Sequence, residues 1–150
     1  MTQRIKLKWE KTTFSKMNDL NDTNFYMFER LDKIIYIGMT AVTSKQSVQD
    51  EINSKKDSMF NGNVSGVSVW LGYFEKDELH SDSIKLLTDN IVRDVENLLI
   101  YKIKPVYNTQ GVKKYDGKDL LIVNEDCSLL PEEIDNTISL KEYLNKQLSK

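Results

Sequence analysis

The chain has 150 residues, which is enough for one domain or for one domain with an additional arm. Its composition, 39% hydrophobic and 29% charged with 6 glycines and 2 prolines, excludes a collagen-like, low-complexity or wholly disordered protein. No apolar run approaches the ~20 residues of a membrane-spanning helix, and the first residues lack the apolar core of a signal peptide. We therefore expect a cytoplasmic protein with no membrane partner.

Charge and the rare residue types narrow the possible sites further. The formal net charge of −2 argues against a protein that holds nucleic acid by bulk positive charge alone. A local basic face remains open near the start of the chain, which carries Arg4, Lys6, Lys8, Lys11 and Lys16 against the acid Glu10. The single cysteine, Cys127, cannot form an internal disulfide, and the single histidine, His80, excludes multi-histidine metal sites.

The first predicted element is a short strand near the start of the chain. Ile5, Leu7 and Trp9 alternate with charged residues, and a period of two indicates a strand with a basic outer face. A frayed terminus is the alternative. The residues 18–24 that follow are rich in Asn and Asp, which is typical of a connection.

A β-hairpin is predicted next. Two β-prone apolar runs, 25–28 and 34–38, flank a short polar segment, and this arrangement favours two antiparallel strands, the second ending at Gly38. Residues 45–56 then place Val48 and Ile52 four positions apart among polar residues, which predicts a short helix with a thin apolar stripe.

The second half of the chain begins with another predicted strand, 67–74. The strongest periodic signal follows: an apolar stripe from Ile84 to Leu99 predicts a long helix that continues to about Lys104, where Pro105 ends it. A polar loop leads to a buried strand over 120–123. Capping-box spacing at Ser139 and Glu142 predicts a terminal helix, whose apolar residues are Leu140, Tyr143, Leu144 and Leu148.

This order of elements predicts an α+β fold, with a small, mainly antiparallel β-sheet flanked by helices and a C-terminal strand-helix extension. We divide the chain into a basic N-terminal arm over 1–23, a core over 24–110 and an extension of the same domain over 111–150.

Glu96 is the most conspicuous candidate for chemistry. Its neighbours on the predicted helix include Val92, Leu99 and Ile100, so its carboxylate lies at the margin of the core. A buried charge of this kind needs a cation, a cluster of donors or a metal. Arg93, three residues earlier, offers an ordinary helical ion pair as the alternative to a metal, and a lone carboxylate suits Mg²⁺ only when waters and phosphate oxygens complete the shell.

Tyr26 and Tyr36 fall at corresponding places on the two strands of the predicted hairpin. Cross-strand aromatic packing explains them without any function, whereas two hydroxyls facing one cavity would hydrogen-bond a water and a phosphate. Asn108 follows the proline that ends the long helix and is by itself an ordinary turn residue.

Together these positions resemble the GIY-YIG nuclease family. Asn24-Phe25-Tyr26 lies ten residues before Tyr36-Ile37-Gly38-Met39-Thr40, like the paired half-motifs of that family, with the first half degenerate and the second intact. The block from Glu96 to Asn108 is similar to the family's Glu-x-x-Leu-Ile…Lys-Pro-x-x-Asn block. The resemblance covers residues 24–108, which makes 24–110 a GIY-YIG-like core.

The resemblance implies hydrolysis of a nucleic-acid phosphodiester with a single divalent cation, Mg²⁺ or Mn²⁺. It implies that Glu96 binds the metal and that Tyr26 activates or positions the attacking water. Tyr36 would orient water or phosphate, and Asn108 would support the site by hydrogen bonds. Gly38 and Thr40, in the intact half-motif, would lie beside the substrate. The cation would neutralise the phosphate while a nearby acceptor takes the proton of the water.

The chain departs from the family in the first helix, where an Arg is expected, followed one turn later by a His or Tyr. Alignment on Val48 and Ile52 puts Glu51 in the Arg position and Lys55 in the His or Tyr position. A Glu beside the scissile phosphate repels it, and loss of a stabilising donor costs on the order of 10²–10³ in rate. Lys55, Lys45 or Lys56 could supply the charge from a shifted helix, and Arg93 could supply it from the long helix. The remaining alternative is that the alignment of this short helix is wrong.

We therefore expect a metal-dependent endonuclease that acts on nucleic acid, with DNA as the first candidate. A catalytically weakened relative that binds DNA, RNA or another protein is the second hypothesis. A chance match on an unrelated α+β protein is the third, and it requires Tyr26, Tyr36 and Glu96 to point into different regions.

Overall fold

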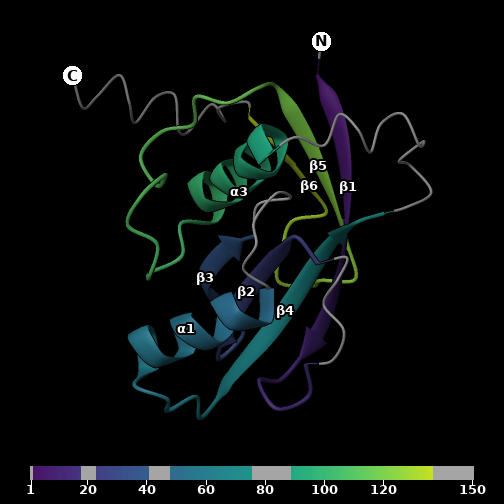
Figure 1. Cartoon of the computed structure of the whole chain (residues 1–150). Coiled ribbons are helices and arrows are strands. Elements are labelled where there is room, and N and C mark those ends of the chain that lie inside the picture. Colours follow the sequence, from purple (N-terminus) through teal and green to yellow (C-terminus); the bar gives the residue numbers. More distant parts are fainter. Residues whose placement is uncertain (1, 18–22, 41–47, 76–88, 137–150) are drawn as a thin grey trace.

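The computed structural model describes residues 2–17, 23–40, 48–75 and 89–136. These residues form an α+β fold in which a six-stranded sheet, with strand order β3-β2-β4-β1-β5-β6, is flanked by two helices (Figure 1). The predicted fold class is confirmed. The elements are β1 (Gln3–Thr12), β2 (Phe25–Arg30), β3 (Lys33–Met39), α1 (Val48–Phe60), β4 (Val67–Phe74), α3 (Asp89–Ile103), β5 (Leu120–Glu125) and β6 (Glu133–Asp135).

The predicted hairpin is formed by β2 and β3. Leu31 and Asp32 make its turn, and both have positive φ angles, 52° and 60°, as a tight connection between twisted strands requires. The strands pair antiparallel, with Tyr26 opposite Gly38 and Phe28 opposite Tyr36. On its other side β2 pairs antiparallel with β4, so β3 is left as one edge of the sheet.

The N-terminal segment contributes a strand to the interior of the sheet. β1 pairs antiparallel with β4 on one side and parallel with β5 on the other, the one parallel pairing among the described strands. The expected alternation is confirmed, because Ile5, Leu7 and Trp9 are buried. The predicted basic face is partly neutralised, since Lys6 forms ion pairs with Glu75 and Glu125.

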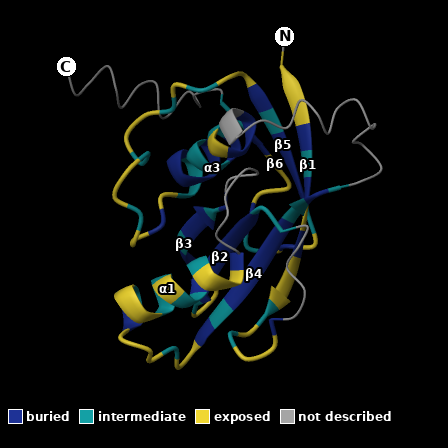
Figure 2. Cartoon of the chain, viewed as in Figure 1, coloured by how far each residue is buried: buried dark blue, intermediate teal, exposed yellow. Residues whose placement is uncertain are grey.

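The two helices cover opposite faces of the sheet. Alternate residues of β2 enter two separate apolar clusters, because successive side chains of a strand point to opposite faces. One cluster contains Phe25 and Met27 and is closed by α3; the other contains Tyr26 and Phe28 and is closed by α1. This explains why β2 is buried along almost its whole length, while the outer side of α1 is exposed (Figure 2).

Both predicted helices within the described residues are present. α1 buries Val48, Ile52 and Phe60, the expected thin apolar stripe, and extends beyond the predicted end at 56. α3 ends just before Lys104 and Pro105, as expected. The short strand β6 was missed by the sequence patterns. The start of the predicted long helix, at Ile84, and the predicted terminal helix lie outside the described residues, and no helix among those described is long and apolar enough to cross a membrane.

Candidate functional site

The loop that follows α3 is tied to the exposed edge of β3. The backbone N–H of Tyr107 donates to the Ile35 carbonyl at 2.9 Å. The Asn108 side chain accepts a hydrogen bond from the Ile37 N–H and donates one to the Ile37 carbonyl, both at 2.9 Å. Asn108 therefore pairs with the edge strand as a neighbouring backbone would, and its amide holds the loop against β3 rather than facing solvent.

A cavity of about 370 Å³ lies where this loop, β3 and the two helices meet. Its walls come from four segments that are distant in the sequence. The residues that matter for chemistry are Tyr36 of β3, Lys55 of α1, Glu96 and Asn97 of α3, and Asn108 and Gln110 of the loop. In Figure 1, α3 lies above β3 and α1 below it, so the helices bring Glu96 and Lys55 to the cavity from two sides.

Glu96 is the acid that lines the described cavity, and its pKa is strongly raised. Burial, together with the negative charge of Glu51, raises its pKa from the ordinary value of 4.5 to about 7, and the positive charges of Arg93 and Lys55 only partly oppose this. No ion pair within 4 Å joins it to Arg93 in the described part of the chain. The carboxylate thus faces a polar space and lacks the helical ion pair that was its ordinary alternative.

Glu51 lies at the centre of a second group of side chains beside the cavity. The Tyr26 hydroxyl donates to Glu51 Oε1 at 3.1 Å, and the Thr40 hydroxyl donates to Glu51 Oε2 at 3.0 Å. Both oxygens of the carboxylate are therefore held in place. Its charge raises the pKa of Glu96, so the position where the resemblance expects a cation carries an anion held in place by two hydroxyls.

Tyr26 is fully buried and does not line the cavity. Burial is the main cause that raises its pKa, followed by its proximity to Tyr36 and Glu51. A buried phenol that donates to a carboxylate keeps its proton near neutral pH. Its ring centroid is 6.0 Å from that of Tyr36, so the two rings pack together. Tyr26 therefore orients Glu51 through its hydroxyl and contacts Tyr36 through its ring.

Gly38 is required by the position of Tyr26. A Cβ atom at this residue would lie 2.5 Å from the Tyr26 hydroxyl oxygen, far inside van der Waals contact. The glycine of the intact half-motif therefore makes room for the phenol across the hairpin. Neither Gly38 nor Thr40 lines the cavity, and both are buried.

The basic candidates are placed very differently from one another. Lys55 lines the cavity, and its ammonium lies 5.6 Å from the centre of the Tyr36 ring, within range of a cation–π interaction. Lys56 and Arg93 do not line it, although the charge of the exposed Arg93 still lowers the pKa of Glu96. Lys45 lies outside the described residues.

Several polar residues of the cavity, Asn97 and Gln110 among them, were missed by the sequence patterns. Asn97 adjoins Glu96 on α3, and Gln110 comes from the loop after Asn108. Nothing local signalled Gln110, because its place depends on how the loop is tied to β3.

Glu96 is the one carboxylate that lines the described cavity, and it is the side chain there that would hold a hard divalent cation. Carboxylate oxygens suit Mg²⁺ and Mn²⁺, and a cation at Glu96 would offset both the burial and the Glu51 charge that raise the pKa of this acid. Among the described residues there is no group of three or more His, Cys, Asp or Glu side chains placed to hold a metal. Waters and substrate oxygens would therefore have to supply most ligands, as is common for Mg²⁺.

Comparisons with protein-family models, with curated proteins and with solved structures gave no match to this chain.

Proposed function

We propose that this protein is a metal-dependent endonuclease that hydrolyses nucleic-acid phosphodiester bonds, with DNA as the expected substrate. The observation that supports this proposal is the meeting of Glu96, Tyr36 and Lys55 at one polar cavity. An acid from one element can bind the cation, while a phenol and an ammonium from two others can contact the phosphate.

Each side chain has a distinct part in this proposal. Glu96 holds the divalent cation. When bound, the cation supplies charge neutralisation at the phosphate and at the leaving oxygen. The Tyr36 hydroxyl orients the phosphate or the attacking water, and the Lys55 ammonium provides the fixed positive charge that the resemblance expects from an arginine.

Glu51, Tyr26 and Asn108 act as positioning residues. Tyr26 and Thr40 hold both oxygens of Glu51. The negative charge of Glu51 favours the binding of a cation at Glu96. Asn108 holds the loop wall against β3 through its two hydrogen bonds to Ile37. This arrangement makes the cation more important than in a site with an arginine, because Lys55 is the one basic side chain that lines the described cavity.

The test is a cleavage assay on labelled duplex and single-stranded DNA with Mn²⁺ or Mg²⁺. Glu96→Gln should lower the rate by about 10²–10³-fold or more, since it removes the charged ligand while keeping the shape. Glu133→Gln, at an exposed position of β6, is the matched control and should cleave like the wild type. Equal cleavage by wild type and Glu96→Gln would contradict the proposal.

The second candidate function is nucleic-acid or protein binding by a catalytically weakened domain. It is favoured by the oriented carboxylate of Glu51 at the position where an arginine is expected, because an anion beside the scissile phosphate opposes its approach. If neither wild type nor Glu96→Gln cleaves DNA, while salt-sensitive binding is retained, this second function replaces the first.

A further inference from the structure

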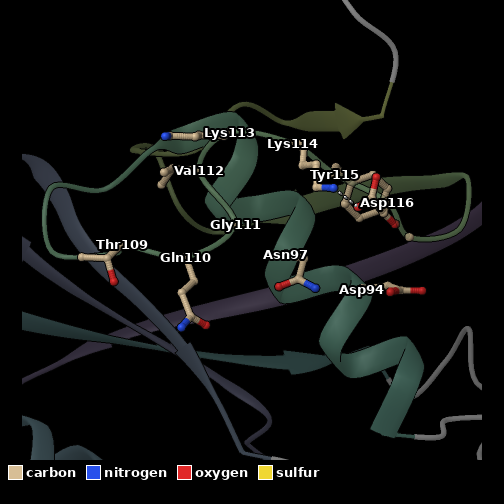
Figure 3. Close-up of a pocket in the computed structure, with 11 residues that line it drawn as sticks. Asp94, Asn97, Thr109, Gln110, Gly111, Val112, Lys113, Lys114, Tyr115 and Asp116 are labelled. Atoms are coloured by element: carbon tan, nitrogen blue, oxygen red, sulfur yellow. Dashed lines mark ion pairs between the residues drawn. The ribbon is translucent and has the colours of Figure 1, made fainter.

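A second cavity, of about 500 Å³, adjoins the one that contains Glu96. The two share the lining residues Asn97, Thr109 and Gln110, so they lie side by side along α3 and the loop. Figure 3 shows Asn97 on α3 and Gln110 on the loop extending from two sides into the same space. The volume is sufficient for a mononucleotide-sized group, since small-ligand sites begin at roughly 300 Å³.

The loop that forms the outer wall has no helix or strand but is held at several points. The Lys104 ammonium donates to the Val112 carbonyl, and the Tyr115 hydroxyl donates to the Lys118 carbonyl. The backbone N–H of Lys118 donates to Asp94 on α3 at 3.3 Å. The wall of the second cavity is therefore preorganised against α3, as a binding site on a loop requires.

The charges of this cavity largely cancel. Lys114 forms an ion pair with Asp116 at 3.2 Å, drawn as a dashed line in Figure 3, and Asp94 accepts the hydrogen bond from Lys118. Lys113 also lines the cavity and lies on the opposite side of the drawn group from Asp94. The space between these charges thus suits an uncharged polar group, with a single cation available at one end.

Two side-chain amides supply the hydrogen-bonding capacity of this space. Within the part of the chain that the structure describes, the amides of Asn97 and Gln110 make no hydrogen bond to another residue. Each amide offers two donor hydrogens and an acceptor oxygen, the pattern that pairs with the edge of a nucleobase, adenine above all.

We propose that the second cavity is a subsite for one unstacked nucleobase of a single strand, next to the phosphate held in the first cavity. The inference rests on the proposed nuclease function, since the first cavity supplies the neighbouring phosphate. Asn97 and Gln110 bind the base edge, and Lys113 contacts a backbone phosphate. An unstacked base is required because paired bases in a duplex do not enter a cavity of this kind.

The experiment measures binding by fluorescence anisotropy in EDTA, without cleavage. The probes are a short labelled oligodeoxyadenylate and an abasic oligomer of equal length and charge. We expect the wild type to prefer the base-bearing strand about tenfold, a typical value for one well-recognised base. Gln110→Leu should abolish this preference, whereas the matched control Gln49→Leu, an exposed amide of α1, should keep it.

Lys113→Ala should act in a different way. It should weaken binding of both probes equally and reduce the magnitude of the salt slope by about 0.7, because one phosphate contact on a single strand is lost. Equal binding of the two probes by the wild type, or an unchanged preference in Gln110→Leu, overturns the subsite. Asn97→Leu provides a second test should Gln110→Leu fail to fold.

These outcomes are separable from those of the cleavage assay. Cleavage that depends on Glu96, combined with no base preference, overturns the subsite alone. A base preference that depends on Gln110, in a protein that cleaves nothing, overturns the nuclease proposal and leaves the subsite standing on a binding protein.

Discussion

Two glutamates of this protein sit at the margin of its apolar core, and their surroundings differ sharply. Glu29 on β2 is 5% exposed; it accepts a hydrogen bond from the Trp70 indole at 2.6 Å, and its carboxylate lies 3.5 Å from the Lys11 ammonium. Glu96 on α3 faces a cavity instead, beside a second carboxylate, that of Glu51. One acid has hydrogen-bond and charge partners, whereas burial and then the charge of Glu51 raise the pKa of the other.

The difference distinguishes a structural acid from a candidate ligand. An indole N–H and an ammonium give a buried carboxylate a hydrogen-bond donor and an opposite charge, which offset the cost of its burial without solvent or substrate. A carboxylate held beside another anion at an open cavity is destabilised in its charged form, and a bound cation would reduce this electrostatic repulsion. Substitutions at Glu29, at Glu96 and at the residues beside them test this contrast.

Glu29→Ala should destabilise the protein by about 3 kcal/mol, since it leaves a buried indole N–H without an acceptor and opens a cavity. Urea unfolding followed by tryptophan fluorescence measures the loss. Glu29→Gln keeps an acceptor for Trp70 and should cost clearly less. If Glu29→Ala unfolds at the wild-type urea concentration, Glu29 is not the structural acid that the comparison assumes.

The effect of Glu96→Gln on stability should have the opposite sign, because near pH 8 it should stabilise the protein by about 2 kcal/mol. The folded protein holds the Glu96 proton up to about pH 7, whereas the unfolded chain releases it near the ordinary pKa of 4.5. The unfolding free energy contributed by Glu96 therefore falls as pH rises from 4.5 through 7, and the wild type and Glu96→Gln should be equally stable at pH 4. Thermal or urea unfolding across this pH range checks the sign.

The metal sharpens the same measurement. At pH 8, Mn²⁺ should raise the stability of the wild type and of Glu133→Gln but not that of Glu96→Gln, because a ligand that binds only the folded state stabilises it. A stability difference between wild type and Glu96→Gln that is the same at pH 4 and pH 8 would contradict the electrostatic account of this acid.

Lys11→Met should destabilise the protein by about 1 kcal/mol or less. The ammonium of Lys11 is half-exposed, so its ion pair with the buried Glu29 is screened by water, and Met keeps most of the packing of the side chain over Trp70. Urea unfolding in low and high salt is the measurement, with the difference shrinking in high salt. A loss as large as that of Glu29→Ala would show that the ion pair, not the indole, satisfies this acid.

Glu51→Gln should leave the fold intact and lower the pKa of Glu96 toward its ordinary value, because one neighbouring negative charge is removed. The amide oxygen of Gln still accepts one of the two hydroxyl hydrogen bonds. Side-chain carboxyl NMR, titrated against pH, follows Glu96 directly. An unchanged or raised pKa of Glu96 would show that Glu51 does not act on it.

Much of the architecture was accessible from local patterns. The two apolar runs around a polar turn predicted the hairpin of β2 and β3. The apolar stripe predicted the part of α3 that the structure describes. Turn chemistry and the period of a strand or helix are properties of neighbouring residues, so they can be read without the fold. The position of Glu96 at the margin of the core followed from the same helical period.

The pairing of distant segments was not accessible in this way. Nothing in residues 3–12 indicates that β1 lies inside the sheet between β4 and β5, because strand partners are chosen across the whole chain. Glu51 appeared only as a residue that departs from the expected pattern. That it is held by Tyr26 and Thr40 depends on α1 packing across the end of β3.

Periodicity and turn residues alone established the α+β class, the hairpin, the end of the long helix and an unusual acid on its surface. The packing of two helices on opposite faces of one sheet decided the rest: which carboxylates share a cavity, which tyrosine reaches it, and which loop closes it. The reason is physical, since the period of a strand or helix is set by covalent geometry within a few residues. The protonation of Glu96, in contrast, depends on burial and on charges contributed by other elements.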